Sequence, residues 1–389
     1  MTDLHEKYAP ILRFHKNEEF YPMRIDDMLR YSALYAKDRD VPIVPAGQVA
    51  PGDLSGRGRS AEAFLRSVEV GPLFGKDVIG GWGSDALELI YRWSAAQRTS
   101  LAEHVARQVY TWFSPKTKAA TQMFWWNGLL AQILQSSTKG FSLSELPRLI
   151  LPSKMHVNAL ERYRAGFQGT PPYTYYYRQV IDGDYLCLQY WFFYSYNDWG
   201  QSFAGMNDHE GDWEGIMLFF RRDALGRPQE PPAYVTFADH DSRQTKPWGH
   251  HDLTCIGAHP VGYVGAGSHA TYPEAGTHIL LKLYNLIDVA PGDGVTIDHN
   301  DWAHRIDIDT VGWLGDFQGS FGTRYWLSLS RARTMLQLAL GPTVFGRLIG
   351  LKVPSEIELP GVSAPRGPVN PNRPQYAHPV AWAGVPVGG

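Results

Sequence analysis

The sequence has few cysteines, no excess of basic residues and no long apolar run, and each absence excludes a class of protein. Two cysteines in 389 residues cannot build a disulfide framework, and Cys187 and Cys255 both lie in apolar, strand-like segments typical of buried free thiols. The formal net charge is -3 and Lys and Arg are spread along the chain, so we expect no nucleic-acid partner. No segment reaches the roughly 18 uninterrupted apolar residues of a membrane-spanning helix.

The N-terminal residues also lack the features of a secretory signal. The segment MTDLHEKYAPILRF has neither a basic region followed by a continuous apolar stretch nor a cleavage site of small residues. We therefore expect a cytoplasmic protein, with any membrane contact limited to the periphery of the bilayer.

The chain does contain enough apolar material for a sizeable core. Apolar residues make up 44% of the sequence and aromatic residues 13%, while the charged fraction of 19% is below the usual quarter. The length is compatible with one elaborated domain or with two smaller ones.

Strand-like patterns dominate residues 166–325. Short aromatic and β-branched runs alternate there with polar turns, and Asp182-Gly183 between two such runs is typical of a tight hairpin, because its backbone tolerates positive φ. Residues 1–27 contain a loosely alternating segment that predicts an edge strand leading into the same sheet. Several short strands with polar turns favour an antiparallel β-sandwich over a parallel sheet.

Helical patterns dominate most of the remainder. Residues 28–165 contain apolar residues at helical spacing and two capping boxes, SLAE and SLSE. Residues 326–352 hold an apolar helix pattern, and residues 353–389 are so rich in Pro and Gly that we expect an extended tail. The predicted fold is α+β: an antiparallel β-sandwich core with a large helical insertion and an extended C-terminal tail.

The segment MNDHEGDWEGIMLFF places ionisable residues directly before an apolar run. His209, Asp212 and Glu214 are spaced by three and two, so a tight turn entering a strand can bring their side chains together. In that arrangement Trp213 and Ile216 point to the other face. The segment therefore predicts a compact group of one imidazole and two carboxylates.

Carboxylates held close together at low dielectric repel each other unless a positive charge lies near them. The segment contains no Lys or Arg, and Asp198 in the preceding strand-like run YSYNDWG can join the group. Oxygen-rich ligands with one imidazole suit Mg²⁺, Ca²⁺ or Mn²⁺ better than structural zinc. The alternative is an ordinary solvated turn without an ion.

Three further histidines are candidates for acid–base chemistry. His240 lies in FADHDSRQ, His251 in PWGHHDL and His269 in GAGSHATYP. If these loops meet at one end of the sandwich, they frame a polar pocket in which an imidazole can serve as a general base. The segment around His251 is equally compatible with an exposed loop that binds nothing.

Three motifs in chain order resemble a known family. The segments YAPILRFHKNEEFYP, HEGDWEGIMLFF and VGYVGAGSHATYP are similar to the family named for vacuolar protein sorting-associated protein 62. The resemblance covers the ends of the expected sandwich, at about 8–22 and 185–275, and leaves residues 28–165 and the tail unexplained. It implies no defined biochemical activity.

A more local resemblance bears on mechanism. The region from YSYNDWG to DHEGDWE is similar to the heptapeptide region of necrosis-inducing, cytolysin-like proteins, which holds a divalent cation used at a membrane surface. This resemblance implies that Asp198, His209, Asp212 and Glu214 are cation ligands. The dipeptide EG stands here in place of a basic residue and a second histidine, and the chain lacks the signal and the disulfide of such toxins. We therefore expect cation binding without toxin activity.

Two functions follow from these expectations. The first is a cation-centred binding protein in which the ion bridges the sandwich to an anionic small molecule or a lipid headgroup. The second is a metal-dependent enzyme of the hydrolase or lyase type, in which His240, His251 or His269 assists a metal-activated water. No nucleophile-elbow motif is present in the sequence, which disfavours a covalent serine intermediate.

Overall fold

The computed structural model describes the strand-rich part of the chain most fully. Its described residues are 3–37, 39, 41–56, 60–68, 153–167, 171–198, 208–239, 242–281, 286–324, 326–328, 356–358, 363–369 and 373–387. Most of the predicted helical insertion and most of the predicted C-terminal helix lie outside these residues.

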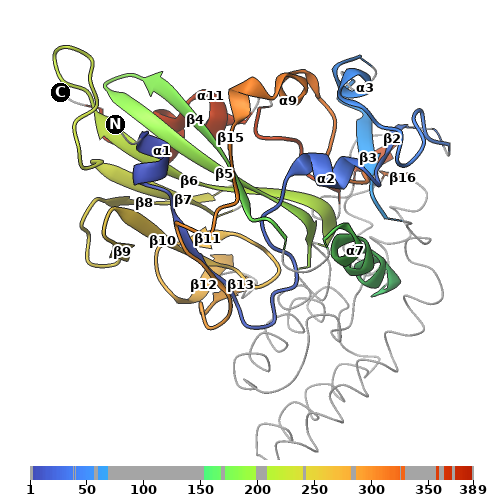
Figure 1. Cartoon of the computed structure of the whole chain (residues 1–389), viewed down its shortest axis with the longest axis horizontal. Helices are drawn as coiled ribbons and strands as arrows, with labels where there is room; N and C mark the ends of the chain where they lie inside the picture. The colour runs from blue at the N-terminus through green and yellow to red at the C-terminus, as the bar shows by residue number, and fades with distance from the viewer. Residues whose placement is uncertain are drawn as a thin grey trace, which may run out of the picture.

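The largest sheet in the described part of the chain has six strands in the order β15-β4-β5-β6-β7-β8 (Figure 1). Neighbouring strands are antiparallel except for β15 and β4, which are parallel. The longest pair is β5 and β6, which face each other along almost their whole length. The strands are β4 (Thr174–Asp182), β5 (Tyr185–Asn197), β6 (His209–Arg221), β7 (Tyr234–Asp239), β8 (Ser242–Pro247) and β15 (His304–Asp307).

A smaller sheet contains the N-terminal strand. Its main path is β11-β10-β1-β14, and β9 pairs with β10. The predicted N-terminal strand is present as β1, but it lies inside this sheet and pairs in parallel with β10, so the expectations of an edge strand and of purely antiparallel pairing are wrong. Strands far apart in sequence are not joined by tight turns, and therefore either direction is possible. The strands are β1 (Ile11–Arg13), β9 (Cys255–Ile256), β10 (His259–Val264), β11 (Thr271–Tyr272) and β14 (Thr296–Ile297).

Three strand pairs complete the β-structure of the described residues. In the block predicted to be mostly helical, β2 and β3 form an antiparallel pair in which Tyr35 stacks on Phe64. The segment predicted as a C-terminal helix begins with strand β16. The pairs are β2 (Ala33–Ala36) with β3 (Ala63–Arg66), β12 (Gly276–Leu281) with β13 (Leu286–Ala290), and β16 (Trp326–Ser328) with β17 (Glu356–Glu358).

The helices in the described residues are mostly short. The longest is α7, which packs against β5 (Figure 1). None of these helices combines the length and apolar character needed to cross a bilayer. The helices are α1 (Leu4–Lys7), α2 (Ile25–Leu29), α3 (Pro51–Gly56), α7 (Ser153–Gly166), α9 (Gly312–Asp316), α11 (Pro374–Ala377) and α12 (Pro379–Ala383), with a 3₁₀ turn η4 (Ile308–Thr310).

The C-terminal segment was predicted to be extended, but it contains two short helices, α11 and α12. Pro374 and Pro379 stand at the first positions of α11 and α12, where a missing N–H costs nothing, and Gly384 closes α12 in the left-handed conformation. Trp382 is buried, and the backbone N–H of Val380 donates to the Asp182 carboxylate. Proline at helix starts therefore accounts for helices that the composition alone did not predict.

The predicted hairpin joins β4 to β5. Asp182 pairs with Tyr185, so Gly183 and Asp184 form a two-residue loop, with Gly183 at a φ of 58°. The positive φ is the conformation that a glycine accepts most readily.

Side chains along β5 alternate between two buried faces. Tyr190 and Phe192 belong to a core shared with the smaller sheet, here called the sheet-side core. Trp191 and Phe193 belong to a second core, the helix-side core, which also contains residues of the helices: Met28 of α2, Tyr163 of α7, Trp313 of α9 and Trp382 of α12. Full burial of such side chains contributes roughly 1.5–3 kcal/mol each. The described residues therefore form a mixed structure of several sheets and few helices, in agreement with the α+β prediction.

The two cysteines are free thiols. Cys187 is buried in the helix-side core and Cys255 is partly buried on β9. Burial raises the pKa of both thiols, which disfavours the reactive thiolate.

The alternation along β6 is interrupted at Gly211, whose φ is 60°. Asp212 pairs with Tyr194, which lies in the sheet-side core, whereas Glu210 pairs with Tyr196, which lies in the helix-side core. In a regular strand, residues two apart share a face. Glu210 and Asp212 therefore lie on opposite faces, with the left-handed backbone of Gly211 between them, and β5 changes face at the same level, between Tyr194 and Tyr196.

Beyond Gly211 the regular alternation resumes. Trp213 lies in the helix-side core, opposite to Asp212, as predicted. Ile216 lies in the sheet-side core, so the prediction that it shares a face with Trp213 is wrong. The two residues are three apart, and an odd separation reverses the face in a strand.

Replacing Gly211 by alanine is expected to lower the free energy of unfolding by about 2–5 kcal/mol. The added Cβ would lie 2.1 Å from the backbone oxygen of Phe321, in a conformation that already disfavours a side chain. Gly183→Ala is the matched control, because Gly183 has a φ of 58° and nothing within 4 Å of an added Cβ. It should lose only about 1–2 kcal/mol in urea denaturation. Equal losses would contradict the close approach at Gly211.

Candidate functional site

Two imidazoles, each held between two carboxylates, lie near the end of β5 and the beginning of β6. His269 has Nε2 3.5 Å from Glu18 Oε1 and Nδ1 3.3 Å from Asp212 Oδ2. We call Glu18, His269 and Asp212 the His269 triad. The second set, the His156 triad, consists of Glu19, His156 and Asp198.

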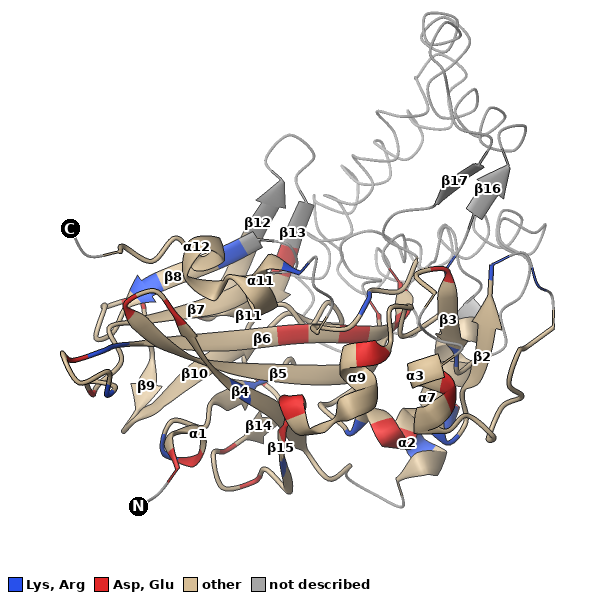
Figure 2. Ribbon diagram, turned by 90° about the horizontal axis from the view of Figure 1, so that it is seen from above, with Lys and Arg blue, Asp and Glu red and all other residues tan. Residues whose placement is uncertain are grey.

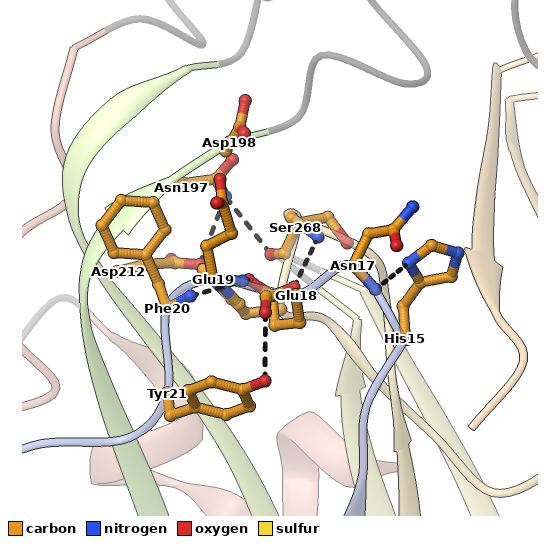
Figure 3. A network of polar contacts seen from close by, with 12 residues as sticks. His15, Asn17, Glu18, Glu19, Phe20, Tyr21, Asn197, Asp198, Asp212 and Ser268 are labelled. Carbon is orange, nitrogen blue, oxygen red and sulfur yellow. Dashed lines mark hydrogen bonds and ion pairs between the residues drawn. The ribbon is translucent and has the colours of Figure 1, made fainter. Parts of the chain in front are cut away.

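The His156 triad has a similar arrangement. The Nε2 atom of His156 lies 3.2 Å from Glu19 Oε2, and its Nδ1 atom lies 3.0 Å from Asp198 Oδ2. Glu18 and Glu19 are adjacent in sequence, so one short segment before α2 supplies a carboxylate to each triad. Figure 3 shows both glutamates beside Asp198 and Asp212.

His269 provides the positive charge of its triad. It is fully buried and its ring stacks on Tyr194 at 3.9 Å. Burial alone would lower the pKa of His269, but the carboxylates of Glu18 and Asp212 outweigh it and raise the pKa to about 9. His269 is also a non-glycine residue at a φ of 59°, a strained conformation of the kind that concentrates at functional sites.

The carboxylate of Glu18 is held ionised by its neighbours. Burial would raise its pKa, but His269 and the backbone N–H groups of Phe20 and Gly267 lower the pKa below the usual value. The N–H of Gly267 donates to Glu18 Oε2 at 2.9 Å. A Cβ at Gly267 would lie 1.8 Å from the backbone oxygen of Asp198, so only glycine lets this loop approach the end of β5.

Asp212 is tied to the end of β5 and to the loop before β11. Its Oδ2 atom accepts from Asn197 Nδ2 at 3.2 Å, and its Oδ1 atom accepts from the N–H of Trp213 at 2.9 Å. Asn197 Nδ2 also donates to the carbonyl oxygen of Ser268 at 3.2 Å. Asn197, which directly precedes Asp198, therefore links both triads through the backbone and through its side-chain amide (Figure 3).

His209 lies directly opposite Asn197 in the strand pair. Directly paired residues share a face, and the Asn197 side chain reaches Asp212, so the interruption at Gly211 puts His209 and Asp212 on the same face. The Nδ1 atom of His209 lies 2.9 Å from the carbonyl oxygen of Gly211. A carbonyl can only accept, so Nδ1 carries the proton and Nε2 is the nitrogen that can ligate an ion.

Glu214 lies on the same strand face as Asp212, two residues further along β6. It pairs with Phe192 of the sheet-side core and is buried. Figure 2 shows the acidic residues of β6 in red. The change of face at Gly211, followed by regular alternation, thus puts His209, Asp212 and Glu214 on one face of β6.

Glu210 faces the other way and is a structural carboxylate. Its Oε1 atom accepts from the N–H and hydroxyl of Ser67 and from the N–H of Val68, and its Oε2 atom accepts from the N–H and hydroxyl of Thr323. These bonds attach β6 to two segments that are far away in sequence. The Glu210 carboxylate thus accepts five hydrogen bonds, which fix its position.

The three histidines proposed as general bases have different positions. His240 lies outside the described residues. The side chain of His251 is 84% exposed, stacks on His250 and lies 2.9 Å from Asp252, on a turn after β8. His269 is enclosed in its triad. Of the two of these histidines that the structure describes, His269 lies against Asp212 and His251 does not.

The sequence analysis did not predict a role in the site for Glu18, Glu19 or His156. The two glutamates lie in YAPILRFHKNEEFYP, the first motif of the family resemblance, which is a signal that was available. His156 lies on α7 in a segment with no motif, and only the packing of α7 on β5 brings it to Asp198.

Two groups of side chains that could hold an ion occur in the part of the chain that the structure describes. In each, one donor atom per residue lies within 4.8 Å of the others. The first is the His156 triad, which is largely buried, and the second is the exposed group of His250, His251 and Asp252. Asp198 thus belongs both to the first group and to the set of ligands that the sequence predicted.

Comparisons with known proteins place few limits on the function. No family model matches the chain and no curated protein matches it, so neither comparison supports the resemblance to the vacuolar protein sorting-associated protein 62 family. A solved structure with partial similarity is the crystal structure of necrosis and ethylene inducing protein 2 from the causal agent of cocoa's witches' broom disease. The match has a TM-score of 0.26 and 13% sequence identity, and it covers 43% of this chain and 68% of that one. This similarity is weak and carries no argument about function.

The raised pKa of His269 predicts a pH dependence of stability in the presence of a chelator. The pKa rises from 6.5 in the unfolded chain to about 9 in the folded one, so the native state holds one more proton between these values. The contribution of His269 is therefore complete below pH 6.5 and is lost as the pH rises through about 9.

The expected loss is on the order of 3 kcal/mol, measured as the free energy of unfolding at a series of pH values. His269→Gln is the comparison, because glutamine keeps hydrogen-bonding atoms but does not titrate. The slope between the two pKa values should disappear in this variant. An unchanged slope would show that His269 is neutral in the folded protein.

Proposed function

We propose that the protein binds a divalent cation at the end of the six-stranded sheet, between the end of β5 and the beginning of β6, and that the ion holds an anionic ligand such as a lipid headgroup. The proposed ligands are Asp198, His209, Asp212 and Glu214. The two facing sheets form the β-sandwich that carries this site, and a peripheral contact with a membrane follows from the headgroup ligand.

The observation that carries the proposal is the reversal of strand alternation at Gly211. Without it, His209 and Asp212 would point to opposite faces of β6, because they are three residues apart. With it, both lie on the face that Asn197 shares, and Asp198 directly follows Asn197 in the chain. A reversal at one glycine that puts an imidazole and two carboxylates on one strand face supports a function for them as a group.

The chemistry of these residues suits a hard or borderline cation. Carboxylate oxygens are the usual ligands of Mg²⁺, Ca²⁺ and Mn²⁺, and a single imidazole is compatible with Mn²⁺ in particular. The hydrogen bond from His209 Nδ1 to the Gly211 carbonyl resembles the support that ligating histidines receive from their surroundings. Such ions commonly retain positions for water, which oxygens of an anionic ligand can fill.

No contact among the described residues favours the enzymatic alternative. A general base must reach the substrate or a bound water within hydrogen-bonding distance. His251 is exposed on the turn after β8, and both ring nitrogens of His269 face carboxylates. The two apolar segments considered for membrane contact, residues 123–134 and 335–351, lie outside the described residues.

Cation binding is tested by calorimetric titration of the full chain with Mg²⁺, Ca²⁺ and Mn²⁺. We expect Asp212→Asn and Glu214→Gln to weaken binding by at least about 10- to 100-fold, the loss that even supporting residues of metal sites produce. Asp223→Asn is the matched control, because Asp223 lies on a surface turn paired with Arg227. Circular dichroism confirms that each variant is folded. Unchanged affinity in both site variants would refute the proposal.

The anionic ligand is tested separately by co-sedimentation with vesicles. Vesicles containing phosphatidylserine should bind the protein in the presence of the cation, and a chelator should release it. Vesicles of phosphatidylcholine alone are the control for a headgroup without net charge. Binding that persists in the chelator would mean that the ion does not mediate recognition.

A further inference from the structure

We propose that the cation site includes Glu19 and His156 as ligands and that it therefore selects Mn²⁺ or Zn²⁺ over Mg²⁺ and Ca²⁺. The inference rests on the proposed function, because Asp198 is common to both sets of ligands. It goes further by naming the class of metal and by adding a helix, α7, to the site.

The geometry of the His156 triad supports this assignment. One donor atom each from Glu19, His156 and Asp198 lies within 4.8 Å of the other two, a separation that one ion can span. The side chains of His156 and Asp198 are each 1% exposed and that of Glu19 is 17% exposed. Glu19 is thus the member of the triad with the most contact with solvent.

The three residues come from parts of the chain that no short-range interaction brings together. Glu19 is in the loop before α2, His156 is in the first turns of α7, and Asp198 directly follows β5. His156 also packs edge-to-face on Phe20 at 5.8 Å and on Tyr196 at 5.9 Å, which fixes the plane of its ring. A pre-oriented ring lowers the entropy lost when an ion binds.

His156 adds a second imidazole to that of His209, and this second nitrogen ligand shifts the metal preference of the site. Imidazole nitrogen suits Mn²⁺ and the later first-row ions, whereas Mg²⁺ and Ca²⁺ prefer sites made of oxygen alone. His156 has a carboxylate at each ring nitrogen, so one nitrogen can bind the ion while the other donates to one oxygen of a carboxylate, whose second oxygen can ligate the ion. This carboxylate–histidine–metal arrangement is common in sites for transition metals and zinc.

An ion in this position would also attach α7 to the sheet. Two of the ligands belong to the loop before α2 and to the end of β5, and the third belongs to α7. A bound ion stabilises any state that brings its ligands together. Metal binding should therefore slow amide hydrogen exchange in the Met155–Ala159 part of α7.

The test uses the full chain, titrated by calorimetry with Mn²⁺, Zn²⁺, Mg²⁺ and Ca²⁺ separately. We expect the wild type to bind Mn²⁺ and Zn²⁺ more tightly, and His156→Gln and Glu19→Gln to lose at least about 10- to 100-fold in affinity for both ions. His378→Gln and Glu161→Gln are matched controls, because they change the same residue types at exposed positions. Both should bind as the wild type does.

Pulsed electron paramagnetic resonance of bound Mn²⁺ identifies the nitrogen ligands directly. Couplings from two imidazole nitrogens, those of His156 and His209, should be present in the wild type, and one of the two should be lost in His156→Gln. Circular dichroism in chelator checks that His156→Gln is folded, and Glu19→Gln, at a less buried position, repeats the affinity test if it is not. Mn²⁺ should slow amide hydrogen exchange in α7 of the wild type. It should not do so in His156→Gln or in Glu19→Gln.

The outcomes separate this inference from the proposed function. If the wild type binds none of the four ions, both are wrong. If it binds an ion with the same affinity in His156→Gln and Glu19→Gln, the proposed function stands and the His156 triad is not part of the site. The same holds if the nitrogen coupling is unchanged in His156→Gln and is lost completely in His209→Gln.

Discussion

The arrangement at the end of the six-stranded sheet depends on the cost of burying carboxylates. Glu18, Asp198, Asp212 and Glu214 are all buried, and ionised groups in a protein interior need positive charge or donated hydrogen bonds. For Glu18 and Asp212 the structure supplies this charge in the imidazole of His269, which its neighbours hold protonated. The sequence pattern predicted a bound ion for the same reason, namely that clustered carboxylates need positive charge nearby. For two of these carboxylates, His269 provides that charge.

The backbone at Gly211 determines on which face of β6 each buried carboxylate of that strand lies. It sends Glu210 to the helix-side core, where five donated hydrogen bonds satisfy its charge, and it leaves His209 and Asp212 together on the opposite face. One glycine in the left-handed conformation thus separates a structural carboxylate from the proposed ion-binding ones. The close packing of Phe321 on Gly211 makes this local geometry a consequence of the surrounding fold.

Much of the strand structure was accessible from local patterns. The Asp182-Gly183 signal led to the β4–β5 hairpin, and the apolar run after Glu214 led to the buried strand β6. The parallel pairing of β1 with β10 was not accessible, because it joins segments about 250 residues apart and leaves no periodic signal. The helices α11 and α12 were not predicted for another reason. A high proline content disfavours a helix interior, but here a proline stands at the start of each helix, where it is tolerated.

The sequence by itself determined that acidic residues and a histidine adjoin a core strand, that the chain has ample aromatic material for a core, and that its formal net charge is -3. These are properties of neighbouring residues and of composition. Only the tertiary structure decided that Glu18 and His269 share a triad with Asp212, and that Glu19 and His156 share one with Asp198. Such contacts arise when the N-terminal segment, α7 and the loop before β11 pack against the end of β5, and packing over long sequence separations leaves no mark in local spacing.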